Sequence, residues 1–198
     1  MYVAQPIEWT ERGVVMLDQR KLPAEEIRYT YTDYREVAKA IREMVIRGAP
    51  AIGVAAAMGV ALGAQKSAAK TMEELKNEFA VICDVLSKTR PTAVDLFWAL
   101  ERMKARFAEL TRSHMDLDGI RQALIKEAQE VHAEKKSTDE AIGRFGAEFM
   151  PKEGHVMTQC NAGALATAGI GTALGVIRVA FQQGRKLHVL VPETRPYL

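Results

Sequence analysis

Hydrophobic and polar positions alternate over short runs in the first part of the chain. Ile7-Glu8-Trp9, the run 14–17 and the run 27–30 are separated by Gly13 and Pro23. Alternation of this kind, interrupted by glycine and proline, is typical of half-buried strands joined by turns. We therefore expect a small antiparallel sheet up to about Thr32.

From Asp33 onward the hydrophobic spacing becomes helical. Asp33 has the character of an N-cap with Glu36 at the capping-box position, and the apolar positions that follow predict a helix to about Ile46. Arg47-Gly48-Ala49-Pro50 interrupts the pattern, because Pro50 disfavours helical geometry in the residue before it and is well suited to begin a new helix. The Ala- and Gly-rich run 49–64 then predicts a buried helix packed closely by its neighbours.

Amphipathic helices are predicted over 72–86, 93–110 and 117–150, with the break Arg90-Pro91-Thr92 between the first two. Their Lys- and Glu-rich faces are expected to be solvated, and we place the pair Lys135-Lys136 on such a face.

The last part of the chain changes to a strand, helix, strand pattern. A strand is expected over 155–159, a turn at Cys160-Asn-Ala-Gly163, a small-residue helix over 164–181 and a second strand over 186–191. This is the building block of a parallel sheet. Because two parallel strands cannot cover their own apolar faces, we expect further strands and interpret the chain as a fragment.

Composition and charge exclude several classes of function. The chain has 198 residues, is 48% hydrophobic and 26% charged, and its 27 basic and 25 acidic residues leave a net charge of +2 without any block of like charge. We therefore expect a globular domain that binds neither nucleic acid nor a membrane. Cys83 and Cys160 are far apart, and neither His132 nor His155 completes a metal-type cluster with them, so we expect no metal and a cytoplasmic location. The start lacks the features of a secretory signal, and the run 49–64 is too short to span a bilayer.

Cys160 is the first candidate for chemistry. It follows a predicted strand and precedes a predicted helix, and a helix N-terminus at that edge of a sheet favours anions and lowers the pKa of a thiol. A buried structural cysteine beside a glycine turn is an equally good interpretation. The glycines at 169, 171 and 175 resemble a dinucleotide fingerprint, but the pattern places them inside the helix, where close packing explains them better.

Two arginines at helix breaks are candidates for phosphate binding. Arg47-Gly48-Ala49 and Arg90-Pro91-Thr92 each combine a guanidinium with exposed amides, although a solvated arginine at a helix end would have the same sequence. Glu193-Thr194-Arg195-Pro196 follows the second strand at the same edge as Cys160; it lines the same crevice or forms a clasp within its own loop. Cys83 lies on an apolar helix face and is assigned to the core.

Taken together, these segments resemble the methylthioribose-1-phosphate isomerase family, which shares a superfamily with ribose-1,5-bisphosphate isomerases and the regulatory subunits of eukaryotic initiation factor 2B. The resemblance covers the whole chain and is carried by four stretches in register: Val45-Ile-Arg-Gly-Ala-Pro-Ala-Ile-Gly53, Arg90-Pro-Thr-Ala-Val-Asp-Leu96, Cys160-Asn-Ala-Gly-Ala-Leu-Ala-Thr-Ala-Gly169 and Glu193-Thr-Arg-Pro196. One departure is Gln159, where the family often has His.

The resemblance implies an α/β fold: a small, mostly helical N-terminal domain with a short antiparallel sheet (1–118), followed by connecting helices and the start of a Rossmann-like parallel-sheet domain (119–198). It implies a homodimeric enzyme of methionine salvage that isomerises 5-methylthioribose 1-phosphate without metal or organic cofactor.

For the site, the resemblance implies that Arg47, Gly48, Ala49 and Arg90 hold the sugar phosphate and that Cys160 is catalytic. The family's catalytic aspartate, Asn-Lys pair and following glutamine would lie beyond Leu198, in a missing C-terminal portion of the same protein, so the isolated fragment is expected to be inactive. A regulatory subunit related to initiation factor 2B and an isomerase of another pentose 1-phosphate are the alternatives.

Overall fold

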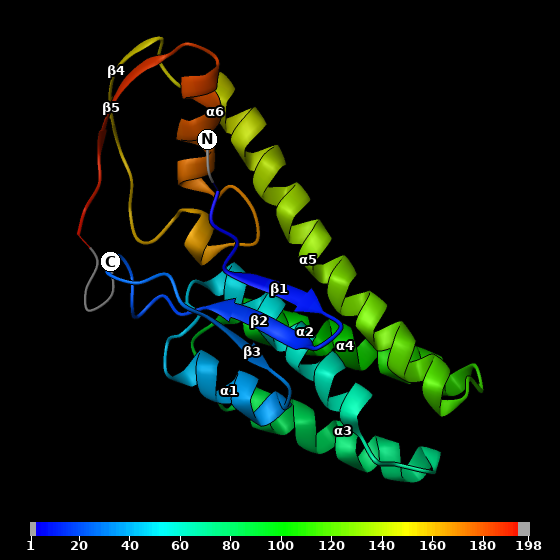
Figure 1. Ribbon diagram of the computed structural model, residues 1–198. Helices are drawn as coiled ribbons and strands as arrows, with labels where there is room; N and C mark the ends of the chain where they lie inside the picture. The colour runs from blue at the N-terminus through cyan, green and yellow to red at the C-terminus, as the bar shows by residue number, and fades with distance from the viewer. Residues whose placement is uncertain (1–2, 194–198) are drawn as a thin grey trace.

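A computed structural model describes residues 3–193 and shows two sheets arranged around a group of helices (Figure 1). The elements run in the order β1 (Ile7–Thr10), β2 (Gly13–Leu17), β3 (Arg28–Tyr31), α1 (Tyr34–Arg42), α2 (Ala49–Lys66), α3 (Met72–Ser87), α4 (Val94–Arg112), α5 (Leu117–Glu148), β4 (Glu153–Met157), the 3₁₀ helix η1 (Ala164–Ala166), α6 (Ala173–Gln182) and β5 (Lys186–Leu190). The predicted class is confirmed: a mostly helical part with a small antiparallel sheet precedes a parallel strand pair.

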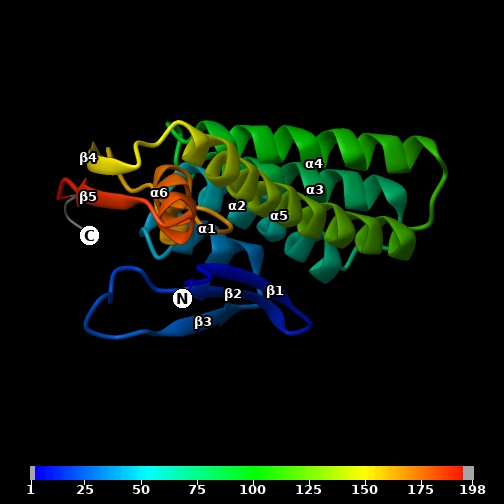
Figure 2. The same cartoon turned by 90° about the horizontal axis from the view of Figure 1, so that it is seen from above.

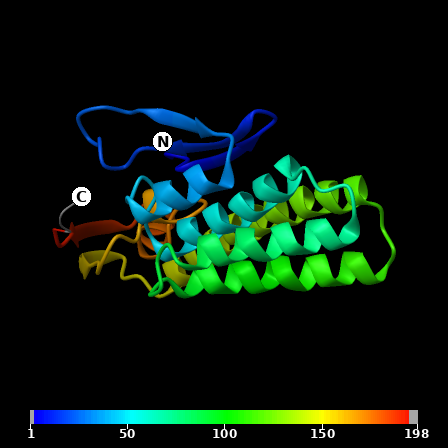
Figure 3. The same cartoon turned by 90° about the horizontal axis from the view of Figure 1, so that it is seen from below.

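The first sheet lies on one side of the helices (Figures 2 and 3). Its strands are antiparallel in the order β1-β2-β3, with Ile7 opposite Met16 and Val14 opposite Tyr31. Ile7, Val14 and Met16 are fully buried in the core, so one face of the sheet covers the helices. The antiparallel sheet predicted from alternation is thereby confirmed.

α1 begins as predicted but ends earlier. The Asp33 side chain accepts a hydrogen bond from the Arg35 N–H (2.8 Å), while Glu36 accepts from the N–H of Thr32 (3.3 Å). The extension to Ile46 is wrong, because Met44 has a φ of 61° and turns the chain out of the helix after Arg42.

α2 is the centre of the helical part. Its 18 residues include an uninterrupted buried run from Ala51 to Ala64, and α1, α3, α4 and α5 all pack against it. Small side chains allow this close approach: a Cβ on Gly63 would lie 2.8 Å from the Ile82 side chain. The predicted buried helix is confirmed.

α3 and α4 agree with the predicted ranges to within a residue or two, and Cys83 lies in the core as predicted. The solvated face predicted for Lys135-Lys136 is wrong for the first lysine. Lys135 Nζ lies 3.0 Å from Asp95 Oδ2 and 4.4 Å from the centre of the Trp98 ring, so its side chain joins α5 to α4. Lys136 is exposed.

β4 and β5 pair in parallel, with His155 opposite His188, and α6 connects them, so the strand, helix, strand prediction holds. A continuous helix over 164–181 is wrong. After η1 the chain forms a loop up to Thr172, because Gly171 has a φ of +92° and lies so close to Ala162 that a Cβ there would meet its carbonyl oxygen at 2.7 Å. Gly169 and Gly171 therefore precede α6 instead of lying inside it.

The 32-residue helix α5 belongs to both parts of the molecule (Figure 1). Ile120, Leu124 and Val131 in its first half lie in the same core as α2, whereas its second half packs against α6. The division at residues 118 and 119 stays a prediction. Within residues 3–193, no helix combines the length and apolar character required to cross a membrane.

Candidate active site

The Arg47–Pro50 break forms the start of α2. Gly48 is the N-cap residue with a φ of 94° and a ψ of 132°, and no side chain caps the helix there. The first helical bond is the one from the Ile52 N–H to the Gly48 carbonyl (2.9 Å). Backbone N–H groups ahead of that bond lack helical partners, so this end of α2 carries donors and a partial positive charge.

The same break lies directly against the segment that follows Cys160. A Cβ on Gly48 would meet the Cβ of Ala166 at 2.4 Å and its carbonyl oxygen at 2.5 Å. Two segments more than a hundred residues apart in the sequence, the Arg47 break and η1, are thus in backbone contact. Only glycine, which has no Cβ, allows the backbone at position 48 to lie this close to Ala166.

Cys160 is exposed and has a φ of 63°, an uncommon value for a residue other than glycine. The interpretation as a buried structural cysteine is therefore wrong. The helix expected directly after the Cys160 turn does not begin there, because α6 begins only at Ala173. The N–H groups of Thr172 and Leu174 at that end donate to the Ala162 carbonyl (3.0 and 3.3 Å).

Arg90 lies between α3 and α4, beside the same end of α2. Gly53 on α2 packs against the beginning of α4, where a Cβ on it would meet the Asp95 carbonyl oxygen at 2.8 Å. Arg90 Nη1 is buried and has no hydrogen-bond partner within the described part of the chain. A buried guanidinium nitrogen without a partner is costly, and a hydrogen bond to an anion would remove that cost.

Gln19, just after β2, was not singled out by the sequence. Its side chain is buried and donates from Nε2 to the Leu165 carbonyl (2.7 Å), while its backbone N–H donates to the Val45 carbonyl (3.0 Å). No local pattern distinguishes a glutamine of this kind from a surface residue at a strand end.

Two α5 residues that were also missed hold the loop before α6. Asp139 is buried and its Oδ2 accepts from the Gly169 N–H (3.0 Å). Burial lowers the pKa of His132, and a hydrogen bond to the Ala168 backbone opposes that change. The loop is therefore anchored on its α5 side.

The fourth candidate segment is only partly described. Leu190, the last residue of β5, pairs with Met157, the last residue of β4. Glu193, just after β5, and Cys160, just after β4, therefore follow the same end of the strand pair. Thr194, Arg195 and Pro196 lie outside the described residues.

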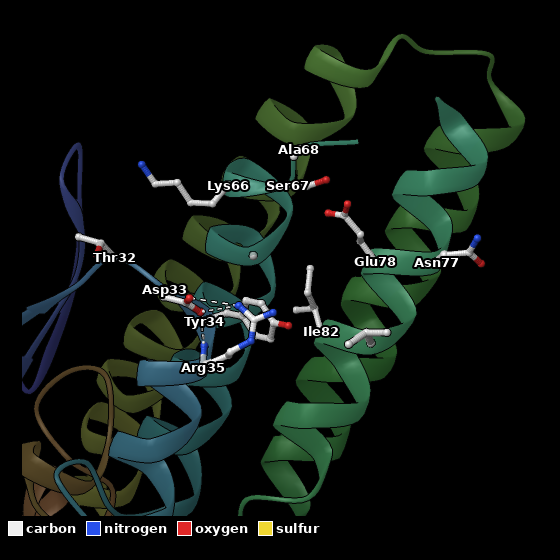
Figure 4. A pocket seen from close by; sticks show the side chains of 12 residues that line it. Thr32, Asp33, Tyr34, Arg35, Lys66, Ser67, Ala68, Asn77, Glu78 and Ile82 are labelled. Atoms are coloured by element: carbon white, nitrogen blue, oxygen red, sulfur yellow. Dashed lines mark hydrogen bonds and ion pairs between the residues drawn. The ribbon is translucent and has the colours of Figure 1, made fainter. Parts of the chain in front are cut away.

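A separate hollow of about 710 Å³ opens between α1, α2 and α3 (Figure 4). It contains Lys66 at the C-terminal end of α2 and an Arg35 guanidinium paired with Asp33 at 3.1 Å. An 18-residue helix is roughly 27 Å long, so this hollow lies at the opposite end of α2 from Arg47. None of the predicted site residues lines it.

Among residues 3–193, no group of three or more His, Cys, Asp or Glu side chains is placed to hold a metal ion. What the structure brings together at this end of α2 is the Arg47 break and η1, through the contact between Gly48 and Ala166.

A family model described as "Initiation factor 2 subunit family" matches residues 45–198, which include Arg47, Arg90 and Cys160. The chain belongs to this family. Among curated family relatives, the methylthioribose-1-phosphate isomerase of Koribacter versatilis is 53% identical over 99% of this chain and 55% of its own length. That of Geobacter sulfurreducens is 55% identical over 97% of this chain and 55% of its own length.

Two solved structures of the family have the same fold. The 5-methylthioribose 1-phosphate isomerase of Pyrococcus horikoshii matches with a TM-score of 0.90 at 41% identity, over 99% of this chain and 54% of its own. The delta subunit of translation initiation factor eIF-2B from A. fulgidus matches with a TM-score of 0.83 at 36% identity, over 97% and 55%. This chain therefore spans about half the length of the relatives it matches.

Proposed function

We propose that this protein is an aldose–ketose isomerase that converts 5-methylthioribose 1-phosphate to 5-methylthioribulose 1-phosphate, a step of methionine salvage. The substrate is the one named for methylthioribose-1-phosphate isomerases that are more than half identical to this chain. The observation that carries it is the contact between Gly48 and Ala166, which brings the Arg47 break to the segment that begins at Cys160.

In the proposed site the phosphate binds at the start of α2. Arg47, Gly48 and Ala49 surround the uncapped end of that helix, where amide donors and the helix dipole favour an anion. Arg90 contributes a guanidinium whose buried Nη1 is without a partner in residues 3–193. A bidentate guanidinium contact fixes the orientation of the phosphate as well as its position.

Cys160 is proposed to transfer protons. A phosphate on the anomeric oxygen prevents spontaneous ring opening, so the ring must be opened before hydrogen moves from carbon 2 to carbon 1. In one route a general base removes the proton at carbon 2 and an enediol is reprotonated at carbon 1; in the other a hydride shifts directly. Both routes oxidise carbon 2 and reduce carbon 1, without an external electron acceptor.

The proposed complete site also requires residues that this chain does not span. By the family resemblance, an aspartate opposite Cys160 and an Asn-Lys pair belong to the part of the relatives beyond the matched half. We further propose a Rossmann-like sheet completed by that part, a homodimer, and a cytoplasmic location consistent with the exposed thiol of Cys160. On this view residues 1–198 alone are inactive.

The test is turnover of the full-length protein with the sugar phosphate, compared with Cys160→Ser and, as the matched control, Cys83→Ala. Loss of a positioned acid or base lowers kcat by roughly 100- to 10,000-fold, so the first variant should lose activity on that scale while the control retains it. Wild-type turnover by Cys160→Ser would refute the role of the thiol. Deuterium from the solvent at carbon 1 would identify the enediol route and rule out the direct hydride shift.

The second candidate is a regulatory subunit, favoured by the likeness to the eIF-2B delta subunit. A scaffold that binds other proteins has no need for an exposed thiol at Cys160, or for a buried Arg90 Nη1 that is without a partner in residues 3–193. Absence of isomerase activity in the full-length native protein would favour this candidate, as would the absence of an aspartate and an Asn-Lys pair downstream of Leu198.

A further inference from the structure

Gln19 connects three segments that are distant in the sequence. It is 2% exposed and lies two residues after the end of β2. Its backbone N–H donates to the Val45 carbonyl at 3.0 Å, and its Nε2 donates to the Leu165 carbonyl, 146 residues away, at 2.7 Å. A buried amide that makes such bonds fixes the relative position of the groups that accept them.

Both acceptors lie beside the proposed site. Val45 precedes Arg47 by two residues, and Leu165 adjoins Ala166, against which Gly48 packs. The hydrogen bonds of Gln19 therefore join the same two segments that meet in the Gly48–Ala166 contact. Together they determine how far the end of α2 lies from the segment that starts at Cys160.

The turn that carries Gln19 is itself held firmly. Asp18 is fully buried, and its carboxylate accepts from the backbone N–H (3.0 Å) and Nε (2.9 Å) of Arg20, with Oδ2 2.9 Å from Nη2. Arg20 Nη1 also reaches Glu43 Oε2 at 3.1 Å. Because its neighbours are fixed, Gln19 cannot follow Leu165 if the loop moves.

On the other side, the loop is held from α5. Asp139 accepts from the Gly169 N–H at 3.0 Å. Segment 165–169 is thus attached to the segment after β2 through Gln19 and to α5 through Asp139. Loss of the Gln19 bond would leave the segment anchored to α5 at Gly169 and allow its other end, at Leu165, to shift.

We propose that Gln19 is a positioning residue for the isomerisation: it sets the distance between the phosphate end of α2 and the Cys160 loop without touching the substrate. This inference rests on the proposed function. A misplacement of about 1 Å in a catalytic group lowers turnover by roughly 100-fold, so the effect should appear mainly in kcat.

Gln19→Glu in the full-length protein tests this, because a carboxylate has nearly the same shape but cannot donate to the Leu165 carbonyl. The backbone bond to Val45 is unchanged. Gln122→Glu, at an exposed position on α5, is the matched control for the change in charge. At pH 8 we expect Gln19→Glu to lose at least about 10-fold in kcat with a smaller change in KM, and Gln122→Glu to match the native enzyme.

A pH profile separates positioning from a purely structural effect. The protonated carboxyl of Gln19→Glu is again a donor, so its kcat relative to the native enzyme should recover as the pH is lowered to about 5. Because protonation also removes the cost of burying a carboxylate, kcat is measured well below the Tm of the variant at each pH, so that a recovery reports positioning and not the folded fraction. If Gln19→Glu does not fold, Gln19→Met, which has a similar length and no donor, should show the same loss in kcat without recovery at low pH.

Alkylation of Cys160 by iodoacetamide, measured by peptide mass without substrate, provides a second readout. We expect the rate to change at least threefold in Gln19→Glu and not in Gln122→Glu. Native kcat together with a native alkylation rate in a folded Gln19 variant would overturn the inference and leave the proposed function intact. If the native protein has no isomerase activity, the proposed function fails, and an altered alkylation rate still supports the positioning of the loop.

Discussion

Gly48 is the position where a single methyl group should do most damage to the proposed site. Its φ of 94° and ψ of 132° lie in a region that side-chain-bearing residues rarely adopt, at a cost of roughly 1–3 kcal/mol. In Gly48→Ala the new Cβ would lie 2.4 Å from the Ala166 Cβ, whereas carbon atoms prefer about 3.5–4.0 Å, so the two segments must separate by about 1 Å.

The matched control is Gly184→Ala. Gly184 also has a positive φ, +83°, but nothing lies within 4 Å of where its Cβ would be. This variant bears only the backbone cost, about 1 kcal/mol, which lowers the Tm by roughly 2–4 °C in a domain of this size. Gly48→Ala adds the displacement and should be the less stable of the two.

The assay is isomerase turnover and thermal unfolding of both variants in the full-length protein. A 1 Å displacement between phosphate and thiol predicts a loss of roughly 100-fold in kcat/KM for Gly48→Ala, against less than about twofold for Gly184→Ala. The reasoning is refuted if Gly48→Ala is as stable as Gly184→Ala and turns over at the native rate, because the contact with Ala166 would then not be essential.

Two further predictions concern titratable groups in the folded protein. Cys83 is 3% exposed, and burial raises its pKa to about 12. Of these two cysteines, iodoacetamide at pH 8 should therefore modify only the exposed Cys160 in the native state, and both in urea. Modification of Cys83 before Cys160 would contradict the assignment of Cys83 to the core. Burial lowers the pKa of His132 in the folded protein below its value in the unfolded chain, which is about 6.5. The neutral side chain therefore contributes fully to stability above about pH 6.5, and this contribution is lost as the pH falls toward the folded-state pKa. The Tm of His132→Gln should therefore fall less between pH 7 and 5 than that of the native protein, and equal slopes would contradict the assignment.

The elements that were predicted well are those determined by local sequence. α3 begins where Thr71 and Glu74 form a capping box, and α4 begins three residues after Pro91, so near-neighbour chemistry was sufficient to place them. α2 was recognisable because small apolar residues in an unbroken run fit only a helix buried on all sides.

The errors arose where distant residues determine the backbone. The loop before α6 has the composition of a small-residue helix, but Asp139, thirty residues earlier, binds the Gly169 N–H and Gly171 packs against Ala162. Tertiary contacts of this kind override helix propensity and leave no trace in hydrophobic spacing. The early end of α1 at Arg42 has a similar origin, since the Val45 carbonyl accepts from Gln19.

The candidate site was predictable as segments but not as geometry. Arg47, Arg90 and Cys160 were recognised from their motifs, whereas the contact that joins two of those segments depends on a backbone approach visible only in the fold. Gln19 could not be found from the sequence, because its role depends on an acceptor 146 residues away.

α5 limits how the two parts of the molecule can move. The helix is continuous over 32 residues and contains no proline, and its first half is packed into one part while its second half supports α6. Independent rotation of the β4–α6–β5 unit would require this rod to bend or to slide past its neighbours. Admission and release of the proposed substrate next to Gly48 should therefore depend on small local rearrangements of the loop instead of a wide hinge opening.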